Sequence, residues 1–369
     1  MKKTLVALAV LGSFAGVASA ATSVTLYGTV DAGYEGWAFK KAYSGVDNFF
    51  IQGSNGQYGT SEKNSKIGVR GQEDLGNGLV AIFTLEGGIG ADNGETNSGQ
   101  LFNRESTVGL KGSFGEVKIG RAKSQMELAL GGIVPGRRVA DVDLYSVALT
   151  RHSNGLFYSY DNAGFSFGAD VTTKGGAPGN SSEGTRNEKI GYGARLGYTG
   201  QVGGGVTLLA RAAYQNDGYN TNAATNDKQR EFGGLLAAVV PFSNNSLTVG
   251  VAYAQGKGYA SDLTDAKGAI PGRVYADKAR TMSAVVAGNF GSSDSAYLKY
   301  QQRKGSVTGT TVYNGNVWAA GYEHNLSKRT SVYADVAYAT IKKDTAIAGV
   351  GANGKGTAIG YSVGVAHNF

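Results

Sequence analysis

The chain has 369 residues, a formal net charge of +7 and no cysteine. Without cysteine it cannot be a small secreted module held together by disulfides. The basic excess is spread out and forms no run with interleaved aromatic residues, so we expect no nucleic-acid partner. Gly and Tyr are numerous, at 59 and 21, whereas Pro and Met are few, at 4 and 3.

The first twenty residues have the pattern of an export signal. Two lysines precede the apolar run Leu5–Val17, and the small-residue sequence ASA ends at Ala20. This order is typical of a bacterial Sec signal peptide, and the apolar run is too short to span a bilayer. We therefore predict a signal peptide over 1–20, cleavage between Ala20 and Ala21, and a single domain over 21–369.

The rest of the chain contains sixteen segments in which apolar residues alternate with small or polar ones. Their lengths are close to the roughly 9–11 residues that a tilted transmembrane strand needs. Successive side chains of a strand point to opposite faces, so one face of each segment is apolar. The segments are Ser23–Tyr34, Asn64–Glu73, Gly78–Gly87, Phe102–Lys111, Gly115–Arg121, Gly155–Tyr160, Gly164–Thr173, Lys189–Tyr198, Val206–Gln215, Glu231–Val240, Leu247–Gln255, Ala279–Asn289, Ala296–Lys304, Asn316–His324, Thr330–Ile341 and Thr357–Phe369.

The connections between these segments alternate between long and short. Asp74–Asn77 and Gly112–Phe114 are short, whereas Ala122–Arg151 and Gly256–Lys278 are long. Short turns at one end and long loops at the other are typical of an outer-membrane barrel, and a secreted sandwich has no reason to sort its connections in this way. All four prolines fall in connections, where no ladder hydrogen bond is lost. The pattern predicts an all-β, sixteen-stranded antiparallel transmembrane barrel.

The last segment reads GTAIGYSVGVAHNF and ends on Phe369. Ile359, Tyr361, Val363 and Val365 share one face with this terminal ring, and the opposite face is small or polar. In a barrel with both ends on one side of the membrane, the last strand pairs with the first and removes both sheet edges. We expect this segment to close the barrel against Ser23–Tyr34.

Four stretches carry a resemblance to a known family: SVTLYGTVDAGY, SKIGVRGQEDLGNGLVAIFTLEGG, LFNRESTVGLKGSFGEVKIGR and the terminal VGVAHNF. They resemble the trimeric general porins of Gram-negative bacteria, of the β-proteobacterial type. The resemblance is detailed over 22–121 and at the C-terminus and architectural between them. It implies a homotrimer, a third loop folded into the lumen, and a C-terminal strand whose Phe369 is recognised by the barrel-assembly machinery.

The segment 122–151 occupies the position of that family's constriction loop. Residues 124–130 are expected to form a short helix with Met126, Leu130 and Ile133 on its apolar side. Enteric porins carry an acidic residue after the loop proline, whereas here two arginines follow. From composition alone an ordinary extracellular loop would fit equally well. The charged residues of the segment that we expect at the constriction are Glu127, Arg137, Arg138, Asp141 and Asp143.

The facing barrel wall is expected to supply cations. Ile67 and Val69 are assigned to the lipid face, which turns Lys66 and Arg70 into the lumen. A Lys or Arg on the lipid face at mid-depth would cost about 2–4 kcal/mol, so the inward position is favoured. The alternative for each cation is an ion pair at the loop rim or between subunits.

The resemblance adds three further cations to this wall. It places Arg104 on the fourth strand and Arg151 at the start of the sixth, and Arg121, which ends the fifth, is expected to anchor the loop root. With the two loop arginines, these residues predict a preference for small anions, which Glu86 and the loop acids would reduce.

We therefore predict an outer-membrane porin for passive diffusion of ions and small hydrophilic solutes. The alternatives are a channel selective for a sugar or a particular anion, and a structural or adhesive barrel. We expect no enzyme activity, cofactor or metal, because His152, His324 and His367 are scattered without a second ligand at metal spacing. Expected partners are two further copies of the chain and lipopolysaccharide, whose phosphates would attract loop Lys and Arg.

Overall fold

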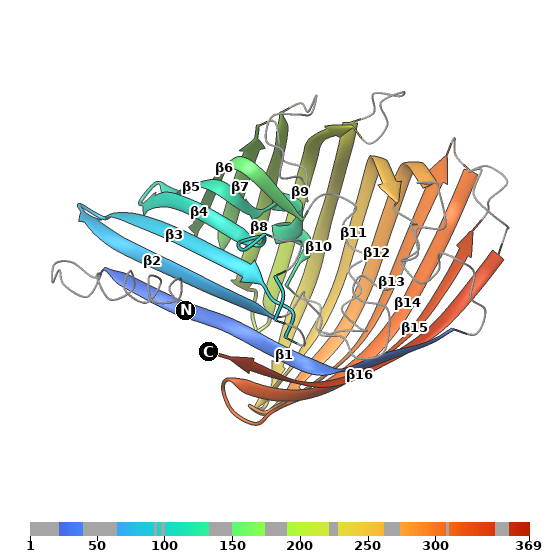
Figure 1. Cartoon of the computed structure of the whole chain (residues 1–369). Helices are drawn as coiled ribbons and strands as arrows, with labels where there is room; N and C mark the ends of the chain where they lie inside the picture. Colours follow the sequence, from blue (N-terminus) through green and yellow to red (C-terminus); the bar gives the residue numbers. More distant parts are fainter. Residues whose placement is uncertain are drawn as a thin grey trace.

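The computed structural model describes residues 22–39, 65–91, 94–96, 100–132, 150–173, 190–220, 228–261, 274–307, 310–343 and 354–369. The predicted signal peptide and its cleavage site, Ala20–Ala21, lie outside these residues. Within the described part, sixteen antiparallel strands form one closed barrel, with β1 hydrogen-bonded to β16 and every other strand to its neighbours in sequence (Figure 1). The predicted fold class and strand order are confirmed.

Apart from the 17-residue β1, the strands of the first half have 8 to 12 residues and those of the second half have 14 to 17. Those of the first half are β1 (Ser23–Phe39), β2 (Lys66–Gly76), β3 (Leu79–Gly88), β4 (Glu105–Gly112), β5 (Gly115–Lys123), β6 (Arg151–Asn162), β7 (Phe165–Thr172) and β8 (Gly191–Gln201). Those of the second half are β9 (Thr207–Asn220), β10 (Lys228–Phe242), β11 (Asn245–Ser261), β12 (Val274–Phe290), β13 (Asp294–Val307), β14 (Thr310–Asn325), β15 (Thr330–Lys343) and β16 (Gly354–Asn368). One helix, α3 (Gln125–Leu130), interrupts the described chain between β5 and β6. No helix of the described residues is long and apolar enough to cross a bilayer.

The two faces of the sheet have the chemistry that the alternation predicts. On β16, Val363 and Val365 are 52% and 47% exposed, whereas Ser362 and Ala366 are each 1% exposed. The apolar face carries large side chains all round the barrel and points outward. The small and polar residues therefore line the lumen, as expected for a barrel that contacts lipid outside and water inside.

The C-terminal residue closes the barrel against β1. The amide of Gly28 donates to the carbonyl oxygen of Phe369 at 3.2 Å, and the amide of Phe369 donates back at 3.1 Å. The ring of Phe369 lies over Gly28, where a Cβ would fall 2.4 Å from the ring Cζ. The terminal phenylalanine is thus paired and packed, and Gly28 is small because the ring occupies the space beside it.

The strand ends differ from the predicted ones chiefly on the side of the long loops. β11 runs to Ser261, whereas the alternation predicts an end at Gln255. β6 begins at Arg151, whereas the alternation predicts a start at Gly155. The predicted segments Ala296–Lys304 and Asn316–His324 leave 305–315 as a connection, whereas in the structure only residues 308–309 separate β13 from β14. These extensions project past the apolar belt, where both faces meet water and alternation no longer marks a strand.

On the opposite side the turns are tight. Asn77 and Gly78 connect β2 to β3 with φ of 53° and 77°. Positive φ at both positions is the requirement of a type I′ hairpin turn, and Asn-Gly is its preferred sequence.

Candidate functional site

Helix α3 lies inside the barrel, where the sequence predicts a short helix. The Ser124 hydroxyl accepts from the amide of Glu127 at 3.3 Å and so caps the helix N-terminus. Met126 and Leu130 are 0% and 2% exposed, so the predicted apolar side of the helix is its buried side. The other predicted residues of the loop, namely Ile133, Arg137, Arg138, Asp141 and Asp143, lie outside the described residues.

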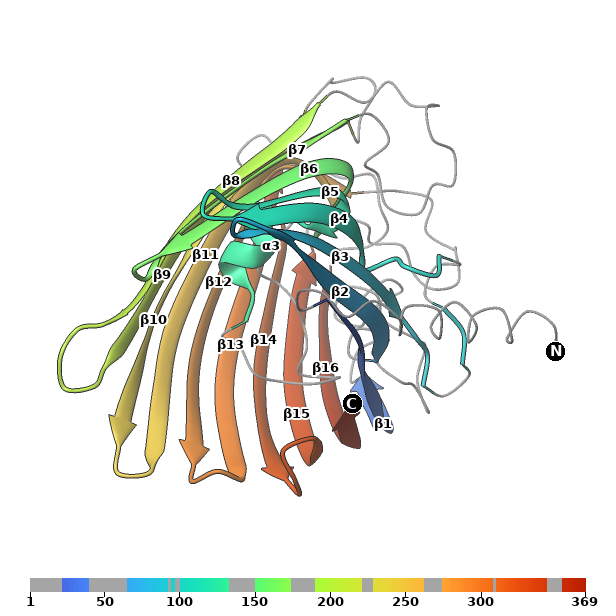
Figure 2. The ribbon, with the colours of Figure 1, turned by 90° about the vertical axis from the view of Figure 1, so that its left-hand side faces the viewer.

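The apolar side of α3 packs on the inner face of the barrel wall. One buried cluster joins the helix to the wall. From α3 it contains Met126, Ala129 and Leu130, and from the wall it contains Ala213 of β9, Leu235 of β10, and Ala252 and Ala254 of β11. Figure 2 shows α3 inside the curve of the sheet. The helix therefore takes up part of the cross-section of the lumen.

Glu86 on the inner face of β3 is the centre of a cationic cluster. Its carboxylate contacts Lys66 Nζ at 3.2 Å and Arg104 Nε at 2.6 Å, and accepts a hydrogen bond from the Tyr27 hydroxyl at 3.1 Å. The Arg70 guanidinium lies 5.1 Å from the centroid of the Tyr27 ring. Lys66 and Arg70 thus share the inner face of β2, as their spacing predicts.

Arg104 reaches this cluster from a position that differs from the expected one. It precedes β4, which begins at Glu105, instead of lying within the strand. Inside the strand its parity would be that of Val108, which is 62% exposed on the outer face. Because the chain turns before Glu105, the alternation of β4 does not extend to Arg104, and its backbone amide also donates to the Glu86 carbonyl oxygen at 3.1 Å.

Arg121 and Arg151 flank the two ends of the segment that contains α3. Arg121 Nε donates to the Asn103 carbonyl oxygen at 2.7 Å, and its Nη1 donates to the Ser153 hydroxyl at 2.6 Å. A β-bulge between Gly120 and Ala122 turns this side chain out of the regular alternation. Arg151 is the first residue of β6 and lies within electrostatic reach of Arg104, Arg121, Glu86 and Glu127.

The charges on this side of the lumen do not balance. Of the two acids within reach of Arg151, Glu86 contacts two cations and Glu127 contacts Lys123 at 3.3 Å. Nearer the short turns the balance is reversed, because Lys118 contacts both Glu105 at 3.1 Å and Glu116 at 3.2 Å. Around Arg151 the cations therefore outnumber the acids.

A buried polar network beside α3 is absent from the predicted site residues. His152 Nδ1 lies 2.6 Å from Asp170 Oδ2, and its Nε2 lies 3.2 Å from both Asp217 Oδ1 and Gln215 Nε2. The sequence pattern assigns no partner to His152. The inward parity of Asp170 between Gly168 and Thr172 on β7 is the sequence feature that could have indicated a partner. The two carboxylates face opposite ring nitrogens, and no group of metal ligands occurs among the described residues.

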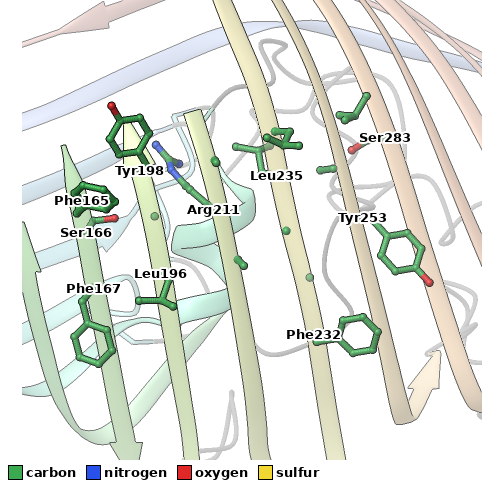
Figure 3. A pocket seen from close by; sticks show the side chains of 18 of the residues that line it. Phe165, Ser166, Phe167, Leu196, Tyr198, Arg211, Phe232, Leu235, Tyr253 and Ser283 are labelled. Atoms are coloured by element: carbon green, nitrogen blue, oxygen red, sulfur yellow. The ribbon is translucent and has the colours of Figure 1, made fainter. Parts of the chain in front are cut away.

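A large groove is lined by residues from both faces of the wall, with Arg211 and Leu235 from the inner face. It has a volume of about 1090 Å³ and is bordered by Leu196 of β8, Phe232 of β10 and Tyr253 of β11 (Figure 3). These side chains are exposed on the apolar face. Ala212 and Gly234, small residues between them, form part of its lining. Its exposed aromatic and aliphatic side chains belong to the apolar outer surface of the barrel.

A closed barrel with an apolar exterior, a polar interior and a helix inside it defines a membrane channel of the β-barrel class. The chain belongs to the Gram-negative porin family, whose model matches residues 7–346. It is 29% identical to an outer membrane porin protein of Bordetella pertussis and 30% identical to outer membrane porin protein 32 of Delftia acidovorans, in each case over the full length of both chains. The protein is therefore an outer-membrane porin.

Solved structures show the same fold. The anion-selective porin from Comamonas acidovorans is 24% identical, with a TM-score of 0.58 over 94% of this chain and all of that one. The trimer form of OmpT from Vibrio cholerae is 14% identical, with a TM-score of 0.61 over 95% of this chain and all of that one.

Proposed function

We propose that the barrel is a water-filled channel through which ions and small hydrophilic solutes diffuse passively, with a preference for anions. The observation that carries the preference is the cluster around Glu86. Lys66 and Arg104 both contact this acid, Arg70 lies at the Tyr27 ring whose hydroxyl donates to it, and Arg151 is within its electrostatic reach. The similarity to the Comamonas acidovorans porin, which is anion-selective, supports the same preference.

The mechanism requires no tight binding step. An anion that enters the narrow part of the lumen replaces some of its hydration by contact with guanidinium and ammonium groups, and it leaves because none of these contacts is strong alone. Fixed cations in a confined lumen also raise the local anion concentration. A cation of the same size meets a repulsive field at the same level.

The rest of the segment 122–151 is proposed to complete the constriction. Arg137 and Arg138 would strengthen the cationic field if they face the lumen, and Asp141 and Asp143 would weaken it. Lys66, Arg70, Arg104, Arg121 and Arg151 are proposed as the wall of the constriction and Glu127 as its acidic counterpart on α3.

Reversal potentials of the purified protein in planar bilayers under a KCl gradient test this function. We expect a reversal potential that lies between zero and the chloride equilibrium potential. Its magnitude should be larger at low salt, because screening at 1 M KCl reduces the reach of a charge to about 3 Å. A reversal potential between zero and the potassium equilibrium potential would refute the anion preference. Membranes with no conductance at any protein concentration would refute the channel.

The proposed assembly is a homotrimer that contacts lipopolysaccharide through loop Lys and Arg. The trimeric OmpT structure supports this stoichiometry through its fold. We further propose that Phe369 is recognised by the barrel-assembly machinery. A high-mass band in mild detergent that collapses to the monomer on boiling is expected, together with three equal conductance steps per insertion. A monomer before boiling and single steps would contradict the trimer.

A further inference from the structure

The inner face of β9 contacts both ends of α3. The amide of Met126, in the first turn, donates to Gln215 Oε1 at 3.3 Å. At the other end, Arg211 Nη1 donates to the carbonyl oxygens of Gly131 at 3.0 Å and Leu128 at 3.5 Å. The first amides and last carbonyls of a helix lack partners within the helix. One strand therefore satisfies groups at both termini.

The spacing on β9 suits the length of the helix. Arg211, Ala213 and Gln215 alternate along the strand and share its inner face, with Ala213 in the buried cluster beneath α3. Four strand residues span about 13 Å. A helix of this length spans about 9 Å, and the two long side chains cover the difference.

The neighbouring strands are hollowed where the helix lies. A Cβ on Gly168 of β7 would fall 2.2 Å from Gln125 Oε1, and one on Gly233 of β10 would fall 3.2 Å from Met126 Sδ. A Cβ on Gly193 of β8 would fall 3.4 Å from the Gln125 Cβ. A side chain larger than alanine at Gly168 or Gly233 would therefore displace the helix, whereas position 193 lies at van der Waals distance from Gln125.

The buried network fixes the orientation of Gln215. Its Nε2 donates to Asp217 and lies 3.2 Å from His152 Nε2, so its oxygen is left to accept from α3. His152 is in turn held by Asp170 at 2.6 Å. Gln215 and His152 are both fully buried, so the amide cannot turn towards water instead.

We propose that β9 positions the constriction, with Arg211 and Gln215 as positioning residues that hold α3 on a seat made by Gly168, Gly193 and Gly233. Arg211 thus fixes the width of the lumen and is distinct from the anion-selecting cations around Glu86. This inference rests on the proposed channel function, because it assigns a role within the constriction.

A disulfide tests whether α3 occupies this seat in the membrane. The Cβ separation of 3.4 Å between Gln125 and a residue at 193 is close to the range of about 3.5–4.5 Å that disulfides show. The chain has no cysteine of its own, so a Gln125→Cys/Gly193→Cys pair can form one intramolecular bond. We expect it to form without added oxidant in the exported protein and to leave the single-channel conductance unchanged on reduction.

The matched control is Leu128→Cys/Gly193→Cys, because Leu128 lies on the exposed side of the same helix. This pair is expected to stay reduced. Equal cross-linking of both pairs, or none of the first in folded protein, would overturn the seat.

The positioning role of Arg211 is tested by open-channel current noise. In Arg211→Gln the helix loses a charge-assisted contact at its C-terminal end, so we expect the time spent in displaced, noisy states to rise about tenfold. Arg195→Gln is the control. It removes the same charge from the inner face of β8, where Arg195 Nη1 donates to the Ser166 hydroxyl at 3.3 Å.

Equal noise in the two variants would overturn the role of Arg211. Reversal potentials measured on the same channels keep this result separate from the proposed function. If the wild type prefers cations but the noise rises only in Arg211→Gln, the proposed anion preference is refuted and the positioning role of Arg211 still holds.

Discussion

Truncating Met126 to alanine removes the largest fully buried side chain of α3 without changing a residue of the barrel wall. The side chain is 0% exposed and lies against Ala213 and Leu235 of the wall. Truncations of a buried Met to Ala cost about 2–5 kcal/mol. The short helix is enclosed by protein on one side only, so we take about 2–3 kcal/mol, which lowers the ratio of docked to undocked helix about 30- to 150-fold.

The assay uses a single thiol at a buried position of the same helix. Ala129 is also 0% exposed, so a maleimide reagent reaches Ala129→Cys only when α3 leaves the wall. When docking is fast, the labelling rate follows the undocked population. Adding Met126→Ala is expected to raise that rate by the same 30- to 150-fold.

Leu128→Ala in the Ala129→Cys background is the control, because Leu128 is 37% exposed. We expect a change of less than about threefold, as for a surface substitution. Equal labelling rates in the Met126 and Leu128 variants would refute the packing argument. The heat stability of the barrel is expected to be the same in both.

Four further predictions concern the wall and its closure. Glu86→Gln leaves Lys66 and Arg104 without their acid, so the reversal potential in a KCl gradient should move further to the chloride side, and a move the other way would contradict the cluster. Arg104→Gln should move it towards potassium, and an unchanged value would exclude Arg104 from the constriction. Gly28→Val should reduce the yield of heat-resistant assembled protein, because its Cβ would lie 2.4 Å from the Phe369 ring and 2.5 Å from the Lys66 carbonyl oxygen. A normal yield would show that assembly does not require the Phe369 ring to pack against residue 28. Deleting Phe369 should impair assembly far more than deleting one residue of the 174–189 connection, and equal assembly would refute the terminal signal.

The architecture could be predicted because one physical rule acts along the whole chain. Each strand separates lipid from water, so its two faces must differ in polarity. Consecutive residues therefore alternate between apolar and polar or small side chains. The same rule places Lys66 and Arg70 in the lumen, since Ile67 between them faces outward. Closure between the first and last strands follows from the need to remove sheet edges.

The rule fails wherever the chain leaves the bilayer. β11 continues to Ser261 and β13 to Val307 in water, where neither face has to be apolar. Arg104 shows the same limit at a single residue. Counted from within β4 its parity is that of the outer face, yet the chain bends before Glu105 and the side chain reaches Glu86 from the turn.

The cradle of α3 could not be predicted from local patterns because its parts are far apart in sequence. Met126 contacts Gln215, 89 positions later in the chain. His152 joins carboxylates from β7 and β9, 18 and 65 positions away. Glycines on the inner faces of β7, β8 and β10 gave a partial indication, since strand glycines often mark a close approach of other atoms. The chain has 59 glycines, so the three that contact α3 cannot be picked out from the sequence alone.

The central claim is that the wall cations around Glu86 set the preference for anions. The most direct measurement compares reversal potentials, in a low-salt KCl gradient, of the wild type and of a variant with Lys66→Gln, Arg70→Gln and Arg151→Gln. The account predicts a chloride-side potential for the wild type and a shift to zero or to the potassium side for the variant. A potassium-side potential in the wild type, or the same chloride-side potential in both proteins, would contradict it.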